Sequence, residues 1–271
     1  RVFNLVKKSS GFGINSAPPV VDFLKVQERK DKIIQQLRNN MQAMLKDIDY
    51  LAGEARILSP QEIKVSGKTI QSRYILIASG SIAYELPQFK FDAKKILSSS
   101  EMLSLREIPG SLLIIGGGFI GCEFAGLFSA LGTKVTLVEK MPRLLPGVDK
   151  EVVKKIEAAF KKKGIKLNTN SDTADLNPAD FDIVLVCVGR IPQTQGLGLE
   201  ELGINLEKGR IITDDYLNTN IGNIYAAGDC TARIMLAHFA GYQGFSAAGN
   251  MANPDNRARV NSINIPSCIF T

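Results

Sequence analysis

Six consecutive residues, Gly116 to Gly121, form the pattern G-x-G-x-x-G between an apolar run and a helix-forming segment. The free backbone N–H groups of such a turn can bind a pyrophosphate, and the dipole of the following helix favours negative charge there. We expect Gly116 to make the tight turn, Gly118 to leave room for phosphates and Gly121 to let the helix pack close to its strand. The other residues of this predicted phosphate-binding segment are Gly117, Phe119 and Ile120.

An acidic residue follows at a suitable distance, because Glu139 ends the next apolar run eighteen residues after Gly121. Its carboxylate can accept hydrogen bonds from both hydroxyls of an adenosine ribose. At a separation of about 4 Å and an effective dielectric constant of about 20, it would repel a 2′-phosphate by about 4 kcal/mol. The adjacent basic residue is Lys140, and lysine matches a phosphate less well than arginine does. These residues predict an NAD site rather than an NADP site; the alternative is that the glycines only pack a helix on a strand.

Two further segments indicate a second nucleotide site outside the first. Ser79, Gly80 and Ser81 close an apolar strand, and Asp229 follows a glycine at the end of another. An aspartate in that position can bind the hydroxyls of a polyol, although a simple turn aspartate is the alternative for that residue alone. Met235, Leu236, Ala237 and His238 precede a segment rich in Ala and Gly, whose backbone a cofactor could approach.

The hydrophobic pattern predicts alternating strands and helices from residue 112 onward. We expect strands at 112–115, 134–138, 165–167 and 182–188, with helices at 119–131 and 148–163. Asp149 is a plausible cap of the second helix and Gly164 its stop. Such alternation is typical of an α/β fold with a doubly wound parallel sheet. Flanking elements are strands at 74–78 and 225–227, a helix at 238–251, a short helix near 100–105 and a loop over 1–17.

A long amphipathic helix is expected after Pro19. Its apolar positions follow the 3.6-residue period, and we expect this stripe to be core. The stripe comprises Ile33, Ile34, Leu37, Met41, Met44, Leu45 and Ile48.

Composition narrows the class of protein. The chain has 271 residues, 45% hydrophobic and 22% charged, which is ordinary for a globular protein of about two domains. The net charge of +6 is scattered, so a solvated surface is favoured over a nucleic-acid patch. Four widely spaced cysteines predict no zinc site and no close redox pair. We expect no membrane span, and a reducing compartment, either a bacterial cytoplasm or an organelle matrix.

Taken in order, the motifs resemble those of the flavoprotein disulfide reductases. They are GGGFIGCE, LVE, RYILIASGS, VCVGRIPQT, IYAAGDCT and MLAHFA. Within that family, VQERKDKIIQQL, MLAH and IPSCIFT are most similar to the dihydrolipoamide dehydrogenases. The resemblance implies a doubly wound NAD-binding domain at 83–209, inserted in a partial FAD-binding domain made of 1–82 and 210–255. Residues 256–271 would begin an interface domain.

The resemblance also implies a role for each matching residue. Gly116 to Gly121, Glu123 and Glu139 would hold NAD, with Gly189 and Arg190 along the same cleft. Along FAD would lie Ala55 at the adenine, Ser79, Gly80 and Ser81, Asp229 at the ribityl chain, and Met235, Leu236, Ala237 and His238 beside the isoalloxazine.

The chain departs from the family pattern in three places. It has no amino-terminal flavin G-x-G-x-x-G, no cysteine pair spaced C-x-x-x-x-C and no interface domain with a catalytic His. For the sole histidine, His238, we expect a buried or backbone-contact role. Ser79 and Gln193 replace the usual Thr and Asn, and the link over 168–180 is shorter than the family's strand meander. We therefore expect a remnant of a longer polypeptide, with no catalytic residue and no metal site in this chain.

For the parent protein the resemblance implies oxidation of dihydrolipoamide through a redox disulfide and FAD, with hydride passed to NAD. Its partners would be 2-oxo acid dehydrogenase complexes and a second copy of itself in a homodimer. The alternatives are a sister NAD-dependent flavoprotein, such as a transhydrogenase or another disulfide reductase, and an inactive or DNA-associated nucleotide-binding module.

Overall fold

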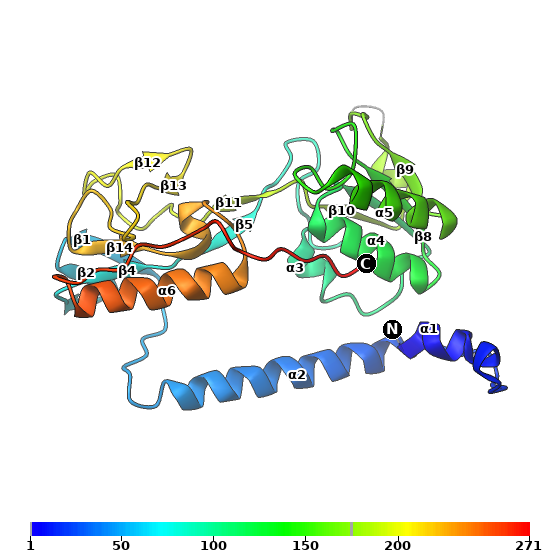
Figure 1. Cartoon of the computed structure of the whole chain (residues 1–271), viewed down its shortest axis with the longest axis horizontal. Helices are drawn as coiled ribbons and strands as arrows, with labels where there is room; N and C mark the ends of the chain where they lie inside the picture. The colour runs from blue at the N-terminus through cyan, green and yellow to red at the C-terminus, as the bar shows by residue number, and fades with distance from the viewer. Residues whose placement is uncertain (1, 174–175) are drawn as a thin grey trace. The chain divides into compact units, whose positions relative to one another are not determined.

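The computed structural model describes residues 2–173 and 176–271, and it divides the chain into two compact units (Figure 1). The first unit comprises Arg1–Lys46, Tyr84–Gly189 and Ile269–Thr271, and the second comprises Asp47–Ala83 and Arg190–Cys268. The segment Tyr84–Gly189 of the first unit thus lies between the two segments of the second along the chain. The boundary at 189/190 differs from the expected one at 209/210, because β11 (Arg190–Pro192) pairs with β5 (Ser81–Ala83) of the second unit.

A five-stranded parallel sheet forms the centre of the first unit. Its order is β6-β10-β7-β8-β9, where the strands are Ile96–Leu97, Ile183–Val186, Ser111–Ile115, Lys134–Val138 and Lys166–Asn168. All four pairings are parallel. If β7, β8, β9 and β10 are numbered 1 to 4 in chain order, their order across the sheet, β9-β8-β7-β10, is 3-2-1-4. The order of the strands therefore reverses between β7 and β10. Ligands of such sheets bind at the carboxyl ends of the strands beside this switch point. The predicted α/β fold with a parallel sheet is confirmed.

Three helices cover one face of this sheet: α3 (Ser99–Met102), α4 (Phe119–Ala130) and α5 (Lys150–Lys162). Asp149 caps α5 as expected, because its carboxylate accepts from the N–H groups of Glu151 and Val152. The opposite face packs against irregular segments that contribute Leu86, Phe89, Phe91, Leu176 and Phe181. A short 3₁₀ helix, η2 (Pro178–Asp180), also lies in the link between β9 and β10.

The second unit is built from short strands and one long helix. β1 (Ala55–Ser59), β2 (Glu62–Val65) and β3 (Lys68–Gln71) form an antiparallel sheet, and β12 (Leu206–Glu207) pairs with β13 (Arg210–Ile211). β4 (Ile75–Ile77) pairs in parallel with β14 (Ile224–Ala226), which is followed by η3 (Gly228–Thr231) and α6 (Ala237–Ala252). Because β4 and β14 are parallel, the segments after them lie at one edge.

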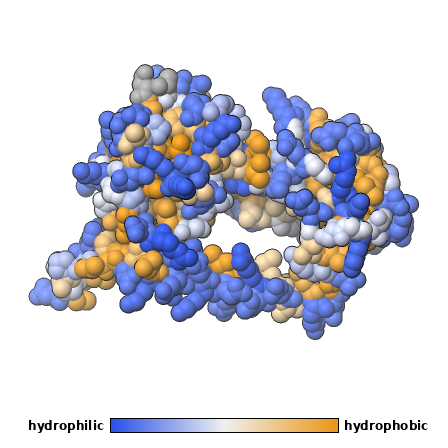
Figure 2. All heavy atoms as spheres, turned by 180° about the vertical axis from the view of Figure 1, so that it is seen from behind, coloured by the Kyte–Doolittle hydropathy of each residue, from blue (hydrophilic) through white to orange (hydrophobic). Residues whose placement is uncertain are grey.

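The amino-terminal region differs from expectation in two respects. Residues predicted as a loop contain α1 (Val2–Lys7) and η1 (Ser9–Phe12), which ends at Gly13 with φ of 75°. The predicted long helix is present as α2 (Phe23–Met44), capped by Asp22. Its apolar stripe is exposed rather than core, as Met41 at 63% and Met44 at 81% exposure show. Figure 2 shows apolar surface among the polar surface of this helix.

The exposure of the stripe has a simple structural reason. α2 packs on the first unit through its first turns: Phe23 lies against Phe128, Gln27 donates to the carbonyl of Leu105 and Lys30 donates to that of Leu103. Periodicity shows which residues share a helix face, but it does not show whether another element covers that face. The prediction that Ile33 to Ile48 form core was therefore wrong for this structure.

No helix in the described ranges is long and apolar enough to cross a membrane. Within residues 2–173 and 176–271, no group of three His, Cys, Asp or Glu side chains could hold a metal ion.

The packing of α4 on its sheet leads to a stability prediction. Phe128 is 1% exposed and packs against Phe23 and Phe124, whereas its neighbour Leu127 is 51% exposed. Phe128→Ala should lower the free energy of unfolding by about 3–5 kcal/mol because it leaves a cavity. Leu127→Ala on the same helix should lower it by less than about 1 kcal/mol. Urea unfolding measures both variants, and equal losses would contradict the described packing.

Candidate functional site

The turn after β7 is held by hydrogen bonds to the next strand and its end. The N–H of Gly116 donates to the carbonyl of Val138 at 2.8 Å, and the N–H of Gly117 donates to Oε2 of Glu139 at 2.6 Å. Gly116 has φ of 113°, and a Cβ there would lie 2.5 Å from the carbonyl oxygen of Cys187. A side chain at Gly116 is therefore excluded both by backbone conformation and by space.

Gly118 and Gly121 differ in what surrounds them. Gly118 is the N-cap of α4, and nothing lies within 4 Å of the position that its Cβ would take. A Cβ on Gly121 would lie 2.0 Å from the carbonyl oxygen of Gly116. The first glycine leaves open space at the helix start, as a phosphate requires, and the second allows α4 to approach the turn.

Glu139 connects the turn to the segment after β8. It is 9% exposed, and its Oε1 accepts the N–H of Met141 at 2.7 Å while Oε2 accepts that of Gly117. Each carboxylate oxygen has two lone pairs, so one acceptor position on each oxygen is still available to a ligand. The side chain is fixed in place before any ligand binds.

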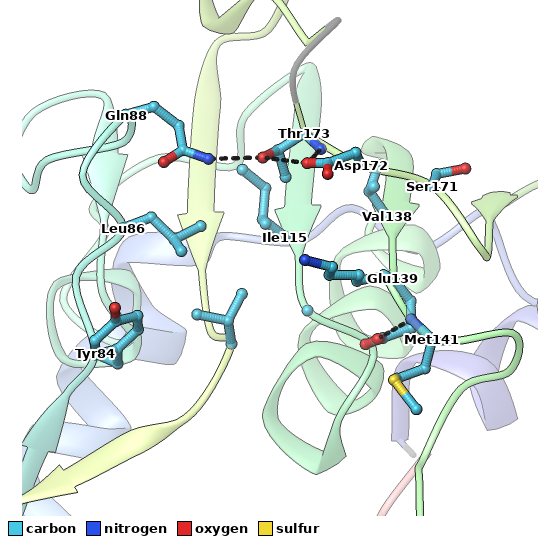
Figure 3. A pocket seen from close by; sticks show the side chains of 13 residues that line it. Tyr84, Leu86, Gln88, Ile115, Val138, Glu139, Met141, Ser171, Asp172 and Thr173 are labelled. Carbon is cyan, nitrogen blue, oxygen red and sulfur yellow. Dashed lines mark hydrogen bonds between the residues drawn. The ribbon is translucent and has the colours of Figure 1, made fainter. Parts of the chain in front are cut away.

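A pocket of about 420 Å³ opens beside Glu139 (Figure 3). It is lined by the ends of β7 and β8, by Val188 after β10, and by residues from 84–88 and 171–173. It therefore lies at the carboxyl ends of the strands on both sides of the switch point, the usual ligand position in such sheets. Its volume is within the range of small-molecule sites. The pocket, the open position at Gly118 and the fixed carboxylate fit the adenosine half of a dinucleotide.

Four other residues predicted for this site, Phe119, Ile120, Glu123 and Gly189, are not among those that line the pocket. Phe119 opens α4 and Ile120 packs against the core of the unit. Glu123 does not line the pocket, and its Oε1 accepts the N–H of Phe270 at 3.0 Å. Gly189 has φ of 149°, and its carbonyl accepts the N–H of Tyr84, a pocket residue, at 3.0 Å. The structure thus brings Gly116 and Glu139 into the pocket wall but directs Glu123 to the chain end.

Two cysteine thiols lie beneath the glycine turn. Cys122 donates to the carbonyl of Gly117 at 3.4 Å and Cys187 to that of Gly116 at 3.5 Å. Burial raises the pKa of Cys122 to about 12. Cys187 is partly exposed as a residue, but its sulfur faces Gly121, and burial of that thiol raises its pKa as well. Both groups are neutral thiols at ordinary pH and support the turn rather than reacting.

In the second unit, three predicted site residues form one polar cluster. Oγ of Ser81 donates to Oδ2 of Asp229 at 2.6 Å. Nε of Arg190 donates to the same Oγ at 2.8 Å, and Nη2 donates to the carbonyl of Ser81 at 2.6 Å. The parallel pairing of β4 and β14 brings Ser81 and Asp229 together although they are 148 residues apart. Arg190, expected along the NAD cleft, forms its hydrogen bonds in this cluster.

Two buried polar atoms near this cluster lack a partner. Oγ of Ser79 and Nε2 of Gln243 form no hydrogen bond within the part of the chain that the structure describes. Gln243 is fully buried, and its Oε1 accepts the N–H of Gly228 at 2.8 Å. Unpaired buried polar atoms are rare and need an explanation. A polar ligand with several hydroxyl or carbonyl groups would satisfy them, and these residues fit the middle part of FAD.

The remaining predicted flavin residues are spread along the second unit. Ala55 is exposed at the start of β1, and Gly80 has φ of 75° with its carbonyl accepting the N–H of Gln193. Met235 and Leu236 are half-buried before α6, and Ala237 begins that helix. The ring Nε2 of His238 bonds to the carbonyl of Pro266 at 2.9 Å, the kind of backbone contact expected for it, although the residue is exposed.

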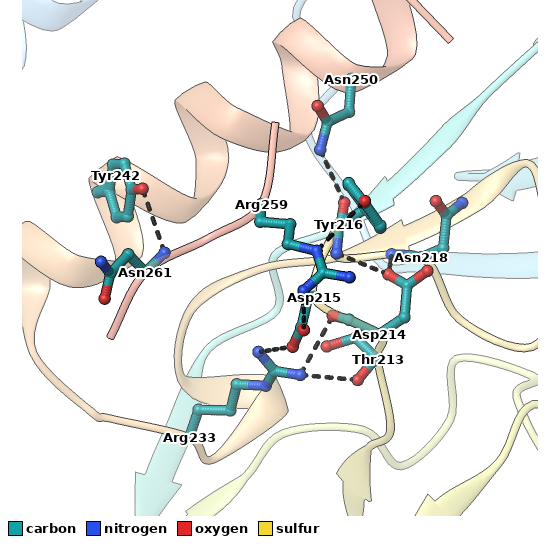
Figure 4. A network of polar contacts seen from close by, with 10 residues as sticks. All are labelled: Thr213, Asp214, Asp215, Tyr216, Asn218, Arg233, Tyr242, Asn250, Arg259 and Asn261. Atoms are coloured by element: carbon teal, nitrogen blue, oxygen red, sulfur yellow. Dashed lines mark hydrogen bonds and ion pairs between the residues drawn. The ribbon is translucent and has the colours of Figure 1, made fainter. Parts of the chain in front are cut away.

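A second polar network in this unit holds the chain after α6 in place (Figure 4). Arg259 bonds to the hydroxyl of Tyr216 and Arg233 bonds to the carbonyl of Thr213. Asn250 of α6 donates to the carbonyls of Tyr216 and Ala258. These contacts explain why residues 256–268, expected to begin another domain, group with the second unit.

Sequence patterns did not identify Gln88, Asp172, Thr173 or Gln243 as site residues. The first three come from irregular segments that reach the pocket only through the fold. Gln243 is a polar residue within a helix, and only its complete burial distinguishes it. The one sequence signal for Gln243 was that a polar residue stands among the small residues of 237–252.

Comparison with known proteins identifies the family. Residues 6–244 match the family described as pyridine nucleotide-disulphide oxidoreductase, and the chain belongs to this family. It is 36% identical over its whole length to a dihydrolipoyl dehydrogenase of Bacillus subtilis, of which it covers 64%, and 34% identical to that of Chlamydia pneumoniae, of which it covers 62%. A third, from Acholeplasma laidlawii, is 33% identical and is covered over 79% of its length. The chain spans less than two thirds of the first two relatives.

Solved structures agree with this assignment. The HOCl-induced flavoprotein disulfide reductase RclA of Escherichia coli has a TM-score of 0.79 and 27% identity, covering 88% of this chain and 59% of that one. LpdA of Mycobacterium tuberculosis has a TM-score of 0.89 and 24% identity, and the match covers the whole of this chain and 64% of the LpdA chain. This likeness supports the fold.

The buried thiols lead to a prediction on chemical reactivity. At pH 8 a thiol with a pKa of about 12 is ionised to only about one part in ten thousand. Dithionitrobenzoate should therefore modify one thiol rapidly in the folded chain, the exposed Cys268, and all four in urea. Cys268→Ser should remove the rapid phase. Two or more rapid thiols in the folded chain would contradict the described burial of Cys122, Cys187 and Cys230.

The position of Gly121 leads to a prediction on binding. Gly121→Ala should weaken NADH binding at least about tenfold, because the added methyl group forces α4 away from the turn. Gly244→Ala in α6 is the matched control, since nothing lies within 4 Å of its Cβ position. NADH fluorescence titration compares the two variants. Unchanged affinity in a folded Gly121→Ala chain would show that the turn does not hold the dinucleotide.

Proposed function

We propose that the chain binds NAD(H) at the glycine turn, with its adenosine ribose on Glu139. The observation that carries this proposal is the buried carboxylate of Glu139, which is fixed by the N–H groups of Gly117 and Met141 at the rim of a 420 Å³ pocket. Gly116 to Gly121 would hold the pyrophosphate through backbone N–H groups at the start of α4. The nearby carboxylate favours NAD over NADP, because the 2′-phosphate would add negative charge beside it.

We propose further that the whole protein is a dihydrolipoyl dehydrogenase that serves 2-oxo acid dehydrogenase complexes. The names of the relatives and their identities of 30–36% support this. When bound, FAD and NAD supply hydride transfer between their rings, and the protein positions them. In this chain, Ser79 and Asp229 would bind the polyol part of FAD, and Ser81 and Arg190 would orient the Asp229 carboxylate.

The thiol chemistry of such an enzyme needs two cysteines close enough to form a disulfide and accessible to substrate. The four cysteines of this chain are free, at positions 122, 187, 230 and 268, and burial raises the pKa of three of them. We therefore propose that the 271-residue chain holds the nicotinamide site and part of the flavin site, while the redox disulfide belongs to a longer protein.

A visible absorption spectrum of the purified chain, before and after NADH is added, tests this proposal. A flavin band that bleaches means that both cofactor sites work in this chain. Absence of a flavin band, together with NADH binding by fluorescence, means that only the nicotinamide site is complete. Absence of NADH binding overturns the proposed NAD site.

Turnover is a separate test. We expect the chain alone to show no NAD-dependent oxidation of dihydrolipoamide, because Cys268 is the only exposed cysteine among its four and a redox disulfide needs two accessible ones. An assay of NAD reduction with dihydrolipoamide, with an active lipoamide dehydrogenase as positive control, checks this. Turnover by the chain alone would require a redox pair that the proposal does not contain.

A further inference from the structure

A second carboxylate lies at the rim of the nucleotide pocket, on the short link between β9 and β10. The N–H of Ser171 donates to the carbonyl of Glu139 at 3.1 Å, and that of Asn170 donates to the carbonyl of Met141 at 2.9 Å. The link therefore runs beside the segment that carries Glu139. Asp172 is the next residue, and it lines the same pocket as Glu139.

Asp172 is held in a chain of hydrogen bonds that joins two sides of the pocket (Figure 3). Its Oδ1 accepts the N–H of Thr173 at 2.6 Å. The hydroxyl of Thr173 in turn accepts from Nε2 of Gln88 at 2.9 Å, and Gln88 lines the pocket from the segment before β6. The carboxylate is thus positioned by the fold although the residue itself is exposed.

The charge of Asp172 affects which ligands the pocket can accept. The ionisable groups lining it are Glu139, Lys140 and Asp172, together with the phenol of Tyr84. The lining thus holds two carboxylates and one ammonium group, so its net negative charge depends on Asp172. Among the described residues Asp172 forms no ion pair.

We propose that Asp172 is a specificity-determining residue that rejects the 2′-phosphate of NADP(H). This inference rests on the proposed NAD site. A 2′-phosphate carries between one and two negative charges and would be repelled by both carboxylates, with Lys140 able to compensate only one of them. The uncharged 2′-hydroxyl of NADH meets no such repulsion. Asp172 therefore discriminates against NADPH without weakening NADH binding.

Asp172→Asn tests the inference, because the amide keeps the acceptor for the N–H of Thr173 and removes only the charge. Dissociation constants of NADH and NADPH are measured by fluorescence on the 271-residue chain. At about 10 mM salt, NADPH binding should strengthen about fivefold or more, while the NADH constant stays within about twofold. At about 1 M salt the gain should largely disappear, because the Debye length falls to about 3 Å.

Two control variants separate charge from structure. Asp172→Glu keeps the charge and should keep the rejection of NADPH. Asp180→Asn removes a carboxylate from the same link but outside the pocket, and should leave both constants unchanged.

The outcomes are distinguishable. No NADH binding by the unaltered chain overturns the proposed NAD site and this inference with it. NADH binding that is selective against NADPH, with no change in Asp172→Asn, overturns the role of Asp172 alone. A gain that does not depend on salt, or that Asp180→Asn shares, also overturns it.

Discussion

The close approach of α4 to the turn before it is the constraint on which the proposed nucleotide site of the first unit depends. A methyl group at Gly121 would lie 2.0 Å from the carbonyl oxygen of Gly116, so the helix start can reach its position only because that residue is glycine. This approach directs the first N–H groups of α4 to the open space at Gly118. It also places the turn where Glu139 can accept the N–H of Gly117.

Further features of the unit follow from this geometry. The parallel order β9-β8-β7-β10 brings the carboxyl ends of three strands to the same pocket, so one carboxylate can be fixed by backbone groups from two of them. The thiols of Cys122 and Cys187 occupy the space beneath the turn and donate to its carbonyls. Their burial keeps them neutral, which suits a site that binds phosphate through N–H groups. In the second unit, too, parallel strands bring distant residues together at their carboxyl ends. The pairing of β4 and β14 assembles the cluster of Ser81, Asp229 and Arg190.

The parts of the fold predicted from sequence are those with a local cause. Alternating apolar runs predicted the parallel sheet, and the side chain of Asp149 predicted the start of α5. The glycine pattern and Glu139 were recognisable because their spacing is set by one strand, one turn and one helix. The exposed stripe of α2 was not predictable, since burial depends on what covers a face. Asp172 and Gln243 were missed because their surroundings are made by segments distant in the chain.

Hydrogen–deuterium exchange with and without NADH would test most directly whether the glycine turn and Glu139 form the nucleotide site. A dinucleotide bound there would order the backbone that contacts it. The account predicts slower exchange at three separate segments, 115–119, 139–141 and 171–173, which the fold brings to one pocket. Slower exchange confined to 227–238 in the second unit, or no change at these three segments under saturating NADH, would contradict it.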